Sequence, residues 1–581
     1  MFCHALRSGA LPSLRRASFV NASGIRASSR LATSSQYAPR RTAVQPAKPV
    51  PSIACRGIAG LLFDDDTIYA LSSAQGKAGI AVIRISGPAC LDIYSRLCPT
   101  KPPPKPRYAT LRTIHSPRPE STIVDSSALV LFFPSPRTVT GEDVLELHVH
   151  GGSATVKAVL SAISQCGSSS SSPASSSSSK KIRYAEPGEF TKRAFLRDRL
   201  DLAQVESLSD TLAAETEQQR RAAVRGASGE LGRTYEGWRA RLLLARAEIE
   251  ALIDFSEDQH FDESPAELLG NVSAMVAEVV RGIRRHEVAG QRTELLRGGI
   301  RIALLGPPNV GKSSLMNLVV GREASIVSHE AGTTRDVVEA SLDLGGYLCS
   351  FADTAGFRSV KKGEGVVIGA VEEEGIRRAR RKAVEADVVV VLASVEEVGG
   401  GGERRVVFDE ETVSLAKKAE ACIVVVNKRD AVGDEGELKR LVEDFKTRAG
   451  LAVEPLAVSC REAAEDSSAD GGSDPGGLHA LTTALIKSFG ELTELPSDMK
   501  DLLGVTERQR QLLVECRGHL EDFLLEARAA GGEDGGSAGD GEADVVLAAE
   551  HLRSAANCLA RITGRGEGGD VEEVLGVIFE K

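Results

Sequence analysis

GPPNVGKS, residues 306–313, is the stretch that decides the fold of the central part of this chain. It matches the spacing G-x-x-x-x-G-K-[ST], in which backbone N–H groups cradle phosphates, the lysine reaches the β- and γ-phosphate oxygens, and the last hydroxyl binds Mg²⁺. A strand-like apolar run at 300–305 precedes the motif, and a helical pattern at 314–320 follows it. This context predicts an α/β P-loop domain in which Lys312 contacts phosphates and Ser313 binds Mg²⁺.

Later motifs follow in the order expected of a guanine-nucleotide site. DTAG, at 353–356, supplies an acid for the Mg²⁺ shell and a glycine N–H that senses the γ-phosphate. NKRD, at 427–430, ends in a carboxylate that accepts two hydrogen bonds from guanine, a pair that adenine cannot donate. SCR, at 459–461, fits the last base-contacting loop, and AGTTRD, at 331–336, fits a switch segment whose Thr334 completes the Mg²⁺ shell. The residues predicted from these motifs to bind GTP are Asn309, Val310, Gly311, Lys312, Ser313, Ser314, Thr334, Asp353, Thr354, Ala355, Gly356, Asn427, Lys428, Asp430, Ser459, Cys460 and Arg461.

Charge is distributed unevenly along the chain. Residues 1–63 contain eight arginines, one lysine and no acid, so a whole-chain charge of −10 leaves about −19 for residues 64–581. An Arg- and Ser-rich, acid-free leader is typical of an organelle transit peptide, and it is also compatible with a disordered basic tail. We therefore expect residues 1–62 to be a mitochondrial import signal and the mature protein to reside in the matrix. The acidic remainder excludes nucleic-acid binding through net charge alone.

The sequence gives no support for a membrane span or for a structure built on zinc or disulfide bonds. No apolar run reaches the length needed to cross a bilayer, which predicts no membrane span. The ten cysteines are scattered without any C-x-x-C, so neither a zinc site nor a disulfide framework can be read from their spacing.

Strand patterns precede the nucleotide motifs. They occur in DTIYALSSAQGKAGIAVIRISG at 66–87, in SALVLFF at 127–133 and in DVLELHVH at 143–150, and helical sequence begins at 153. The low-complexity run SSSSSPASSSSS at 168–179 is expected to interrupt this α+β domain without ending it.

Helical patterns flank the nucleotide motifs on both sides. They run from about 199 to 297 and again from about 498, with Val546 to Ile562 as the last segment. This arrangement predicts one discontinuous all-α domain into which an α/β P-loop GTPase domain is inserted. The predicted domains are an N-terminal α+β domain at 63–197, a helical domain at 198–297 and 490–581, and a G domain at 298–489.

Beyond these patterns, the sequence resembles the MnmE/TrmE family of tRNA-modification GTPases. GPPNVGKSSLMN, SIVSHEAGTTRD and DTAGFR carry the resemblance within the G domain. Outside it, TGEDVLELHVHGG at 140–152, AEPGEFTKRAFLRDRLDLAQVESLSD at 185–210 and ALIDFSED at 251–258 are similar to the family's other signatures. The resemblance covers most of 66–579, apart from the serine insert and a few loops.

The resemblance implies a potassium-activated GTPase that dimerises through its G domains. The K⁺ ligands would be Asn309, Ser328, Glu330 and Thr333, and Ser328 and Thr333 would also contact GTP. The family pattern V-E-x-x-G-I reappears as VEEEGI at 371–376. By residue match the resemblance implies Glu372 as the catalytic residue that orients the attacking water, and the neighbouring Glu373 and Glu374 are alternatives for the same role. SVKKGEGVVIGA, which precedes it, is an insertion relative to the family.

The resemblance also implies a folate-binding N-terminal domain that forms a homodimer. A tetrahydrofolate derivative, 5,10-methylene- or 5-formyl-, would contact Arg84, Glu146, Arg199 and Lys581. The chain ends in GVIFEK, where the family motif F-C-[IV]-G-K has a cysteine. With an FAD-dependent partner of the MnmG type, such a protein would add an aminomethyl-type group, carboxymethylaminomethyl or related, at C5 of uridine 34 in tRNA.

Two other function classes share the G motifs. A ribosome-assembly GTPase of the Era/EngA kind would carry a KH-like domain, and no GXXG loop in a KH-like context is seen. A regulatory GTPase with a degenerate folate domain is the third alternative. Tetrahydrofolate binding by residues 64–200 would separate these readings.

Overall fold

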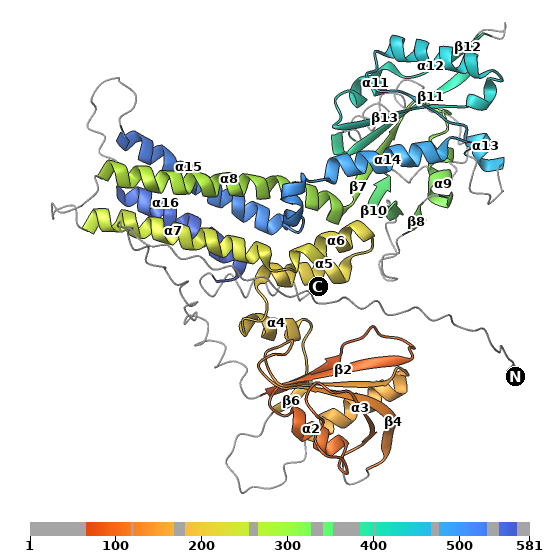
Figure 1. Ribbon diagram of the computed structural model, residues 1–581. Coiled ribbons are helices and arrows are strands. Elements are labelled where there is room, and N and C mark those ends of the chain that lie inside the picture. Colours follow the sequence, from red (N-terminus) through yellow and green to blue (C-terminus); the bar gives the residue numbers. More distant parts are fainter. Residues whose placement is uncertain are drawn as a thin grey trace, which may run out of the picture. The chain divides into compact units, whose positions relative to one another are not determined.

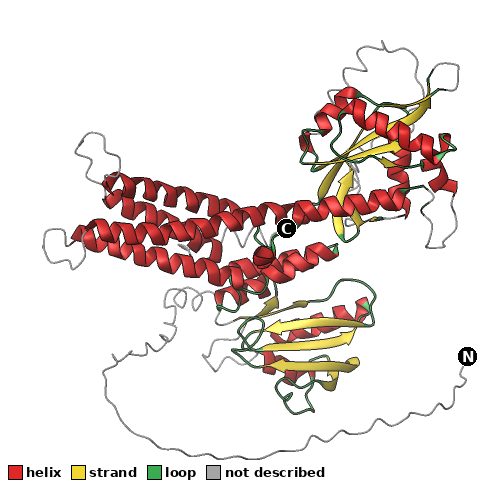
Figure 2. Cartoon of the chain, turned by 45° about the horizontal axis from the view of Figure 1, so that its top comes forward, coloured by secondary structure: helices red, strands yellow, loops and turns green. Residues whose placement is uncertain are grey.

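The computed structural model describes residues 66–117, 121–167, 181–254, 265–322, 324–326, 341–351, 381, 384–398, 403–465, 474, 476–531 and 545–565. These residues form an N-terminal sheet with two helices, a helical bundle and a second, mainly parallel sheet flanked by helices (Figures 1 and 2). The predicted transit peptide and serine insert lie outside the described residues.

The N-terminal sheet follows the predicted α+β pattern. Its elements are β1 (Asp66–Leu71), β2 (Ile80–Ser86), α2 (Cys90–Leu97), β3 (Thr110–His115), β4 (Ile123–Phe133), β5 (Val144–His150), α3 (Ser153–Gly167) and β6 (Lys181–Tyr184). The strand order is β3-β4-β5-β2-β1-β6. Side chains alternate between the faces of the strands, so Ile83, Ile85, Leu145 and Leu147 share one core with residues of α2 and α3.

Two strands of this sheet differ from the sequence prediction. β4 begins four residues earlier than the predicted run at 127–133, because Ile123 pairs with His115 of β3 and extends the ladder. β6 was not predicted, and it pairs in parallel with β1 directly after the serine insert. The chain therefore returns to the same sheet, as the interrupted-domain prediction requires.

The helical part combines segments from both sides of the nucleotide motifs. The earlier helices are α4 (Glu189–Leu196), α5 (Leu202–Ala213), α6 (Glu217–Gly226), α7 (Glu230–Asp254) and α8 (Pro265–Gly298). The later elements are η3 (Ser497–Leu502), α15 (Glu507–Gly531) and α16 (Val545–Thr563). Helices α7, α8, α15 and α16 share one hydrophobic core (Figure 1), so sequence before and after the second sheet contributes to one bundle.

Helices α5 and α6 begin where their sequences provide caps. Asp201 and Thr216 each form a capping box with the residue three positions later. Along α5, apolar residues recur at intervals of three and four residues, but the face that they form is only partly buried. Leu202 and Val205 lie in the interior, whereas Leu208 is 37% and Leu212 is 82% exposed. The prediction of a helix in this segment is confirmed, but the buried face of the helix is narrower than the spacing of its apolar residues suggests.

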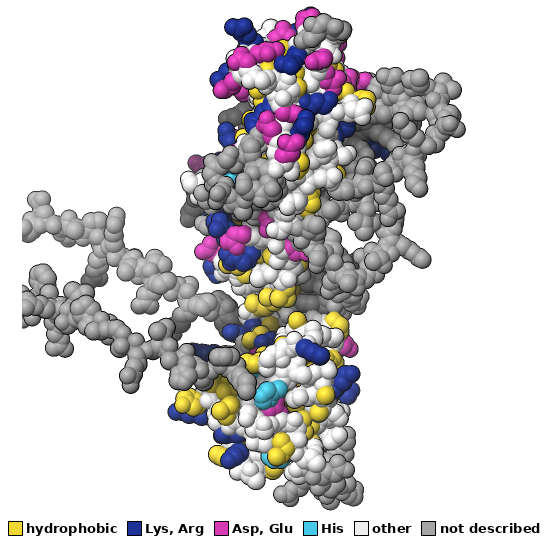
Figure 3. Space-filling view, turned by 90° about the vertical axis from the view of Figure 1, so that its right-hand side faces the viewer, with side chains coloured by type: hydrophobic (Ala, Val, Ile, Leu, Met, Phe, Trp, Pro, Cys, Tyr) yellow, Lys and Arg dark blue, Asp and Glu magenta, His cyan; other side chains and the backbone are white. Residues whose placement is uncertain are grey.

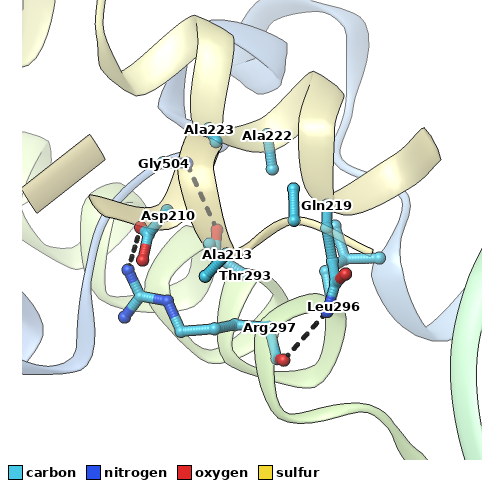
Figure 4. Close-up of a pocket in the computed structure, with 10 residues that line it drawn as sticks. Asp210, Ala213, Gln219, Ala222, Ala223, Thr293, Leu296, Arg297 and Gly504 are labelled. Carbon is cyan, nitrogen blue, oxygen red and sulfur yellow. Dashed lines mark hydrogen bonds and ion pairs between the residues drawn. The ribbon is translucent and has the colours of Figure 1, made fainter. Parts of the chain in front are cut away.

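A small pocket marks the contact of α5 and α6 with α8 (Figure 4). The Arg297 guanidinium pairs with Asp210, Gln219 Nε2 donates to Arg297 O at 3.1 Å, and the Gly504 N–H donates to Thr293 Oγ1 at 3.4 Å. Burial raises the pKa of Asp210 although Arg297 opposes the shift. These contacts tie the last turn of α8 to its neighbours, and β7 begins two residues after that helix.

The second sheet carries the nucleotide motifs. Its strands are β7 (Ile300–Leu305), β8 (Ser325–Ile326), β9 (Ser341–Leu344), β10 (Tyr347–Phe351), β11 (Val388–Glu397), β12 (Arg404–Val407), β13 (Ala421–Asn427) and β14 (Leu456–Ala457). The order is β14-β13-β11-β7-β10-β9-β8, with β12 paired to β11, and the five strands from β14 to β10 are parallel. The predicted α/β organisation is therefore present.

Both faces of this sheet are covered. One face packs on α9 (Lys312–Arg322) and α14 (Leu478–Thr493), and the other on α11 (Glu410–Ala416) and α12 (Glu435–Ala449). Strand residues alternate between the two cores, as Val390 and Val391 of β11 do. Because both faces are buried, these strands read as continuous apolar runs rather than as alternating ones.

The surface carries charges of both signs. In the upper part of the face shown in Figure 3, acidic and basic side chains lie interspersed. Exposed ion pairs, such as Lys439–Glu435 at 2.9 Å, occur among the described residues. In the lower part of that view, the charged side chains that can be seen are mainly basic. No helix in the described ranges combines the length and the apolar composition needed to span a membrane.

Candidate nucleotide-binding site

The nucleotide motifs within the described residues meet at one edge of the second sheet. The loop at 306–311 follows β7, the NKRD motif begins at the last residue of β13, and the SCR motif begins two residues after β14. These strands run parallel, so their carboxyl ends lie at the same edge, where ligands of open α/β sheets bind. The 3₁₀ turn η2 (Arg429–Ala431) and helix α13 (Cys460–Glu465) continue the two base-side motifs.

The phosphate-binding loop needs its glycines. Gly306 has φ +150°, and a Cβ there would lie 2.4 Å from Leu392 O. Gly311 has φ +102°, and a Cβ there would lie 2.2 Å from Asn427 Nδ2. Asn309 adopts a left-handed conformation with φ 60°, which asparagine tolerates better than most residues. The loop can therefore turn tightly against β11 and β13 and bring its backbone close to a phosphate.

Positive charge gathers at the start of α9. Lys312 Nζ donates to Gly306 O and Pro307 O, each at 2.8 Å, so its ammonium lies over the loop. Ser313 and Ser314 are exposed in the first turn of this helix. The N-terminal turn carries a partial positive charge and N–H groups without intrahelical partners. The arrangement suits a di- or triphosphate.

Asn427 ties the phosphate side of the site to the base side. Its side chain is 3% exposed, Nδ2 donates to Val310 O at 2.8 Å, and Oδ1 accepts from the Cys460 N–H at 3.2 Å. One buried amide therefore fixes the spacing between the phosphate-binding loop and the 459–461 loop. Burial raises the pKa of the neighbouring Cys460 thiol, despite a hydrogen bond with Asn427 that acts in the opposite direction.

We expect Asn427→Ala to weaken GDP and GTP binding about 10- to 100-fold, because two backbone groups, one buried and one part-buried, lose their partner at once. Equilibrium binding of a fluorescent guanine nucleotide measures this effect. Asn317→Ala is the matched control, since it removes an exposed amide on α9. Equal affinity of the Asn427→Ala and wild-type proteins would show that this clamp does not shape the site.

The base side is organised around Asp430. Asp430 Oδ1 accepts a hydrogen bond from Ser459 Oγ at 2.7 Å, and Ser459 Oγ accepts from the Glu462 N–H at 3.1 Å. Asp430 is exposed, so its carboxylate is accessible to a base. A carboxylate in this position matches the paired N1 and N2 donors of guanine.

Lys428 and Arg461 flank the base side. Lys428 has φ 63°, and its Nζ donates to Glu396 Oε1 at 2.8 Å, a bond that lowers the pKa of Glu396. The Arg461 guanidinium pairs with Glu465 of its own helix at 3.0 Å. The structure therefore directs the side chain of Arg461 to its helix rather than to the loops of the site.

Several predicted site residues lie outside the described residues. They are Ser328, Glu330, Thr333, Thr334, Asp353, Thr354, Ala355, Gly356, Glu372 and Lys581. Their predicted roles as Mg²⁺, K⁺, γ-phosphate, water and folate contacts stay predictions.

The structure brings two of the predicted folate contacts together. Arg84 of β2 and Glu146 of β5 are direct partners in the ladder, and Arg84 Nη2 lies 2.9 Å from Glu146 Oε1. Both side chains are half-buried on the sheet face opposite the Ile83–Leu147 core, and the Arg84 guanidinium lies 5.9 Å from the centroid of the Phe190 ring. The third predicted contact, Arg199, donates from its Nε to Thr138 O at 3.0 Å.

His148 is a candidate contact that the sequence analysis missed. It lies two residues after Glu146 on β5 and therefore on the same face. Its buried Nε2 has no hydrogen-bond partner within the described structure and lies 3.6 Å from Glu146 Oε2. A buried nitrogen of this kind is costly unless a ligand or water pairs with it. The two-residue period of the strand could have identified it from Glu146.

A buried ionic cluster, also missed, lies next to this sheet. Arg193 of α4 is 1% exposed and contacts Asp66 Oδ1 at 2.6 Å, Glu189 Oε1 at 3.0 Å and Glu142 Oε2 at 3.2 Å. Arg183 and Arg197 complete the cluster. Glu189, Arg193 and Arg197 fall at intervals of four residues within the sequence 185–210, a spacing that places them on one helix face.

Three features meet at the carboxyl edge of this parallel sheet: the glycine-dependent loop with Lys312, the buried Asn427 and the Asp430–Ser459 pair. Together they define the protein as a P-loop GTPase. Two family models match the chain, "GTP-binding protein TrmE N-terminus" at residues 67–199 and "MnmE helical domain" at 202–581. The chain belongs to the MnmE family of tRNA modification GTPases.

Relatives are similar over most of the chain. It is 38% identical to tRNA modification GTPase MnmE of Parvibaculum lavamentivorans over 88% of its own length and 98% of the relative's. It is 37% identical to the mitochondrial 5-taurinomethyluridine-[tRNA] synthase subunit GTPB3 of Danio rerio, covering 91% and 94% of the two chains. With the mitochondrial tRNA modification GTPase MSS1 of Saccharomyces cerevisiae, the identity is 34%, over 89% and 93%.

This chain is also similar to a solved structure of Era with MgGDPNP and nucleotides of 16S ribosomal RNA. The matched region covers 38% of this chain and 66% of the Era chain, with 23% sequence identity and a TM-score of 0.23. That likeness is too weak to favour the ribosome-assembly alternative. The match to the TrmE N-terminus lies entirely outside the G motifs.

Proposed function

We propose that this protein uses GTP hydrolysis to drive modification of C5 of the wobble uridine, position 34, of mitochondrial tRNAs. It would act with an FAD-dependent protein of the MnmG type and add a carboxymethylaminomethyl or related aminomethyl group. The observation that carries this proposal is that one chain of this family joins a guanine-nucleotide site to a sheet bearing the Arg84–Glu146 pair.

The nucleotide part would bind GTP with Mg²⁺ and K⁺. Ser313, exposed at the start of α9, would bind Mg²⁺ together with Thr334. Asn309 belongs to the predicted phosphate-binding loop, where its left-handed backbone forms part of the turn before Lys312. It would bind K⁺ together with Ser328, Glu330 and Thr333. A cation there stabilises the charge that develops during phosphoryl transfer. Glu372 would orient the attacking water.

The N-terminal sheet fits a folate. A pterin offers N–H donors to a carboxylate such as Glu146, and a folate carries carboxylates that arginine binds bidentately. The unpaired His148 Nε2 on the same face supplies a further polar contact. Arg199 and Lys581 would contact the same cofactor. When bound, a tetrahydrofolate derivative, 5,10-methylene or 5-formyl, would supply the one-carbon unit.

Exposed apolar side chains near the β3 edge of this sheet support a homodimer through the N-terminal domain. Tyr108, Leu111 and Ile123 are 61%, 66% and 64% exposed, and clusters of exposed large apolar residues often mark interfaces. The mitochondrial relatives from fish and yeast support a mitochondrial location, with the matrix as the compartment.

The wobble-uridine proposal predicts that organellar tRNA from a deletion strain lacks the C5 modification. Mass spectrometry of nucleosides from purified mitochondrial tRNAs measures it, and the wild-type gene should restore it. Unchanged nucleosides in the deletion strain would overturn the proposal.

Glu146→Gln tests the folate site separately. We expect binding of 5-formyltetrahydrofolate to weaken at least ~10-fold, because a charged hydrogen-bond acceptor becomes neutral, while the GTPase rate stays within about twofold of wild type. Glu186→Gln, at an exposed position before α4, is the control. Unchanged folate affinity in Glu146→Gln would exclude this residue from the site.

The potassium proposal predicts a GTPase rate at least ~10 times higher in KCl than in NaCl at equal ionic strength, since a missing transition-state cation costs orders of magnitude. The Asn309→Ala variant should lose most of the difference. Equal rates in the two salts would remove the proposed K⁺ site and leave the nucleotide site itself unaffected.

A further inference from the structure

Five side chains able to bind metal ions lie together between α15 and α16, in the helical bundle. Glu515, His519 and Asp522 follow one another on α15 at intervals of four and three residues, which places them on one face of the helix. His551 and Cys558 lie seven residues apart on α16, again on one face. The ligand atoms of His519, Asp522 and His551 lie within 4.8 Å of one another, and so do those of Glu515, His519 and Cys558.

We propose that His519, Asp522 and His551 form a binding site for one divalent transition-metal ion, with Zn²⁺ as the ion whose ligand preference fits best. Two imidazoles and a carboxylate are common zinc ligands, and three protein ligands leave a fourth position for water. This set comes from two helices and includes no cysteine. No reading of cysteine spacing along the sequence could therefore find it.

The distances allow an ion to be bound with small side-chain movements. Zinc–nitrogen and zinc–oxygen bonds of roughly 2.1 Å at tetrahedral angles separate the ligand atoms by about 3.4 Å. The ligand atoms lie within 4.8 Å of one another, so they have to approach by at most about 1.4 Å. The rings of His519 and His551 lie 6.4 Å apart between centroids and are inclined by 36°. Both rings are half-buried and Asp522 is exposed, so all three side chains have room to rotate.

The backbones beneath these side chains are held firmly. Leu520 and Phe523 of α15 and Leu552 of α16 are fully buried in the bundle core. Cys516 Sγ lies 3.4 Å from Ala555 O across the same helix pair. Ligands carried on packed helices meet an ion with little loss of backbone entropy, which favours a specific site over a chance surface cluster.

The second group is the weaker candidate. The Cys558 residue is 3% exposed, and Glu515 lies 3.7 Å from the Arg561 guanidinium. An ion bound there would have to enter the core and displace this ion pair. The His519–Asp522–His551 group is open to solvent through Asp522 and does not require either step.

A bound ion would join α15 to α16. Each helix contributes at least one ligand, so the ion stabilises the folded bundle whenever it binds the native state more tightly than the unfolded chain. We therefore expect Zn²⁺ to raise the midpoint of thermal unfolding of the bundle, which the single tryptophan, Trp238 of α7, reports by its fluorescence.

The test uses the full-length protein with bound Mg²⁺·GDP, stripped of other metals with a chelator and then titrated with Zn²⁺ in competition with a chromogenic chelator. We expect the double variant His519→Ala/His551→Ala to bind one Zn²⁺ fewer per chain than wild type, and Asp522→Asn to weaken that site at least ~10-fold. His479→Ala, which removes an exposed histidine of α14, is the matched control and should bind as wild type does. Equal zinc stoichiometry and affinity in the double variant and the wild type would overturn the proposal.

Two further measurements keep the ligand set falsifiable. Cys558→Ser should leave zinc affinity unchanged, and Co²⁺ bound in place of zinc should show no thiolate-to-cobalt charge-transfer band. Loss of the site in Cys558→Ser, or a thiolate band in wild type, would overturn the assignment in favour of the Glu515–His519–Cys558 group. Because GTPase activity is measured on the same samples, retained activity shows that the variants are folded.

Discussion

Replacing Asp430 with asparagine is expected to change the base preference of the site from guanine to xanthine. The Asp430 carboxylate can accept from both N1 and N2 of guanine, whereas an asparagine amide turns one of its two atoms into a donor and opposes the N2 amino group. Xanthine has an oxygen at that position, and an amide N–H can pair with it. We expect GTP affinity to fall about 10³-fold or more, and xanthosine triphosphate to bind better than GTP.

Ser459 makes this substitution a clean test. Its hydroxyl donates to Asp430 Oδ1 at 2.7 Å, and an asparagine keeps an oxygen for that bond while turning its nitrogen towards the base. The loop geometry should therefore survive. Competition of each nucleotide against a fluorescent GDP analogue, together with hydrolysis rates for both triphosphates, measures the switch. Asp434→Asn, at the N-cap of α12, is the control and should keep guanine preference. A variant at Asp430 that still prefers GTP would show that another group selects the base.

The nucleotide motifs could be found from the sequence because each of them is local. Lys312, Ser313 and the loop glycines lie within eight consecutive residues, and the strand–loop–helix order around them is fixed by short-range periodicity. Asp430 lies three residues after Asn427, at the end of an apolar strand. For such motifs the spacing along the chain nearly determines the spacing in space. What the motif did not reveal was the role of Asn427 as a clamp, because its two partners lie in different loops.

Groups of residues that come from distant segments of the chain could not be predicted from local sequence motifs. Arg84 and Glu146 meet only because β2 and β5 are neighbours in the sheet, and their pairing depends on a register that the sequence does not specify. The resemblance named both residues without showing that they touch. His519 and His551 lie on two helices, and neither residue has a local motif around it. Long-range packing decides these contacts, and hydrophobic periodicity gives only the faces that are available for it.

Burial of charge was the least predictable feature. Charged residues are almost never fully buried unless they are paired, so Arg193 looks like a surface residue of α4 when it is taken alone. Its burial follows from three carboxylates that arrive from different parts of the chain: Asp66 on β1, Glu142 before β5 and Glu189 on its own helix. Only the fold brings these together with Arg183 and Arg197.

Replacing Arg193 with alanine is expected to destabilise the N-terminal sheet by about 3–5 kcal/mol, because removing one partner leaves buried carboxylates without compensation. Arg193→Lys should retain part of the stability, since a single ammonium cannot meet three carboxylates in a fixed fork. Hydrogen exchange followed by mass spectrometry measures the loss in peptides covering β1, β6 and α4. Peptides of α7 and α8, in the separate bundle core, provide the internal control.

The pH dependence of this loss provides an independent check. Burial pushes the pKa of Glu189 upwards, but hydrogen bonds from Arg183, the Glu186 N–H and Arg193 outweigh it and hold the pKa below its usual value. A lowered folded-state pKa contributes stability above the unfolded value, near pH 4.5, and that contribution disappears as the pH falls through the folded value. The difference between wild type and Arg193→Ala should therefore be largest above about pH 5 and shrink in acid, as protonation neutralises the carboxylates that the variant leaves unpaired. A difference that stayed constant from pH 7 to pH 4 would point to lost packing of the arginine side chain, rather than uncompensated charge, as the cause.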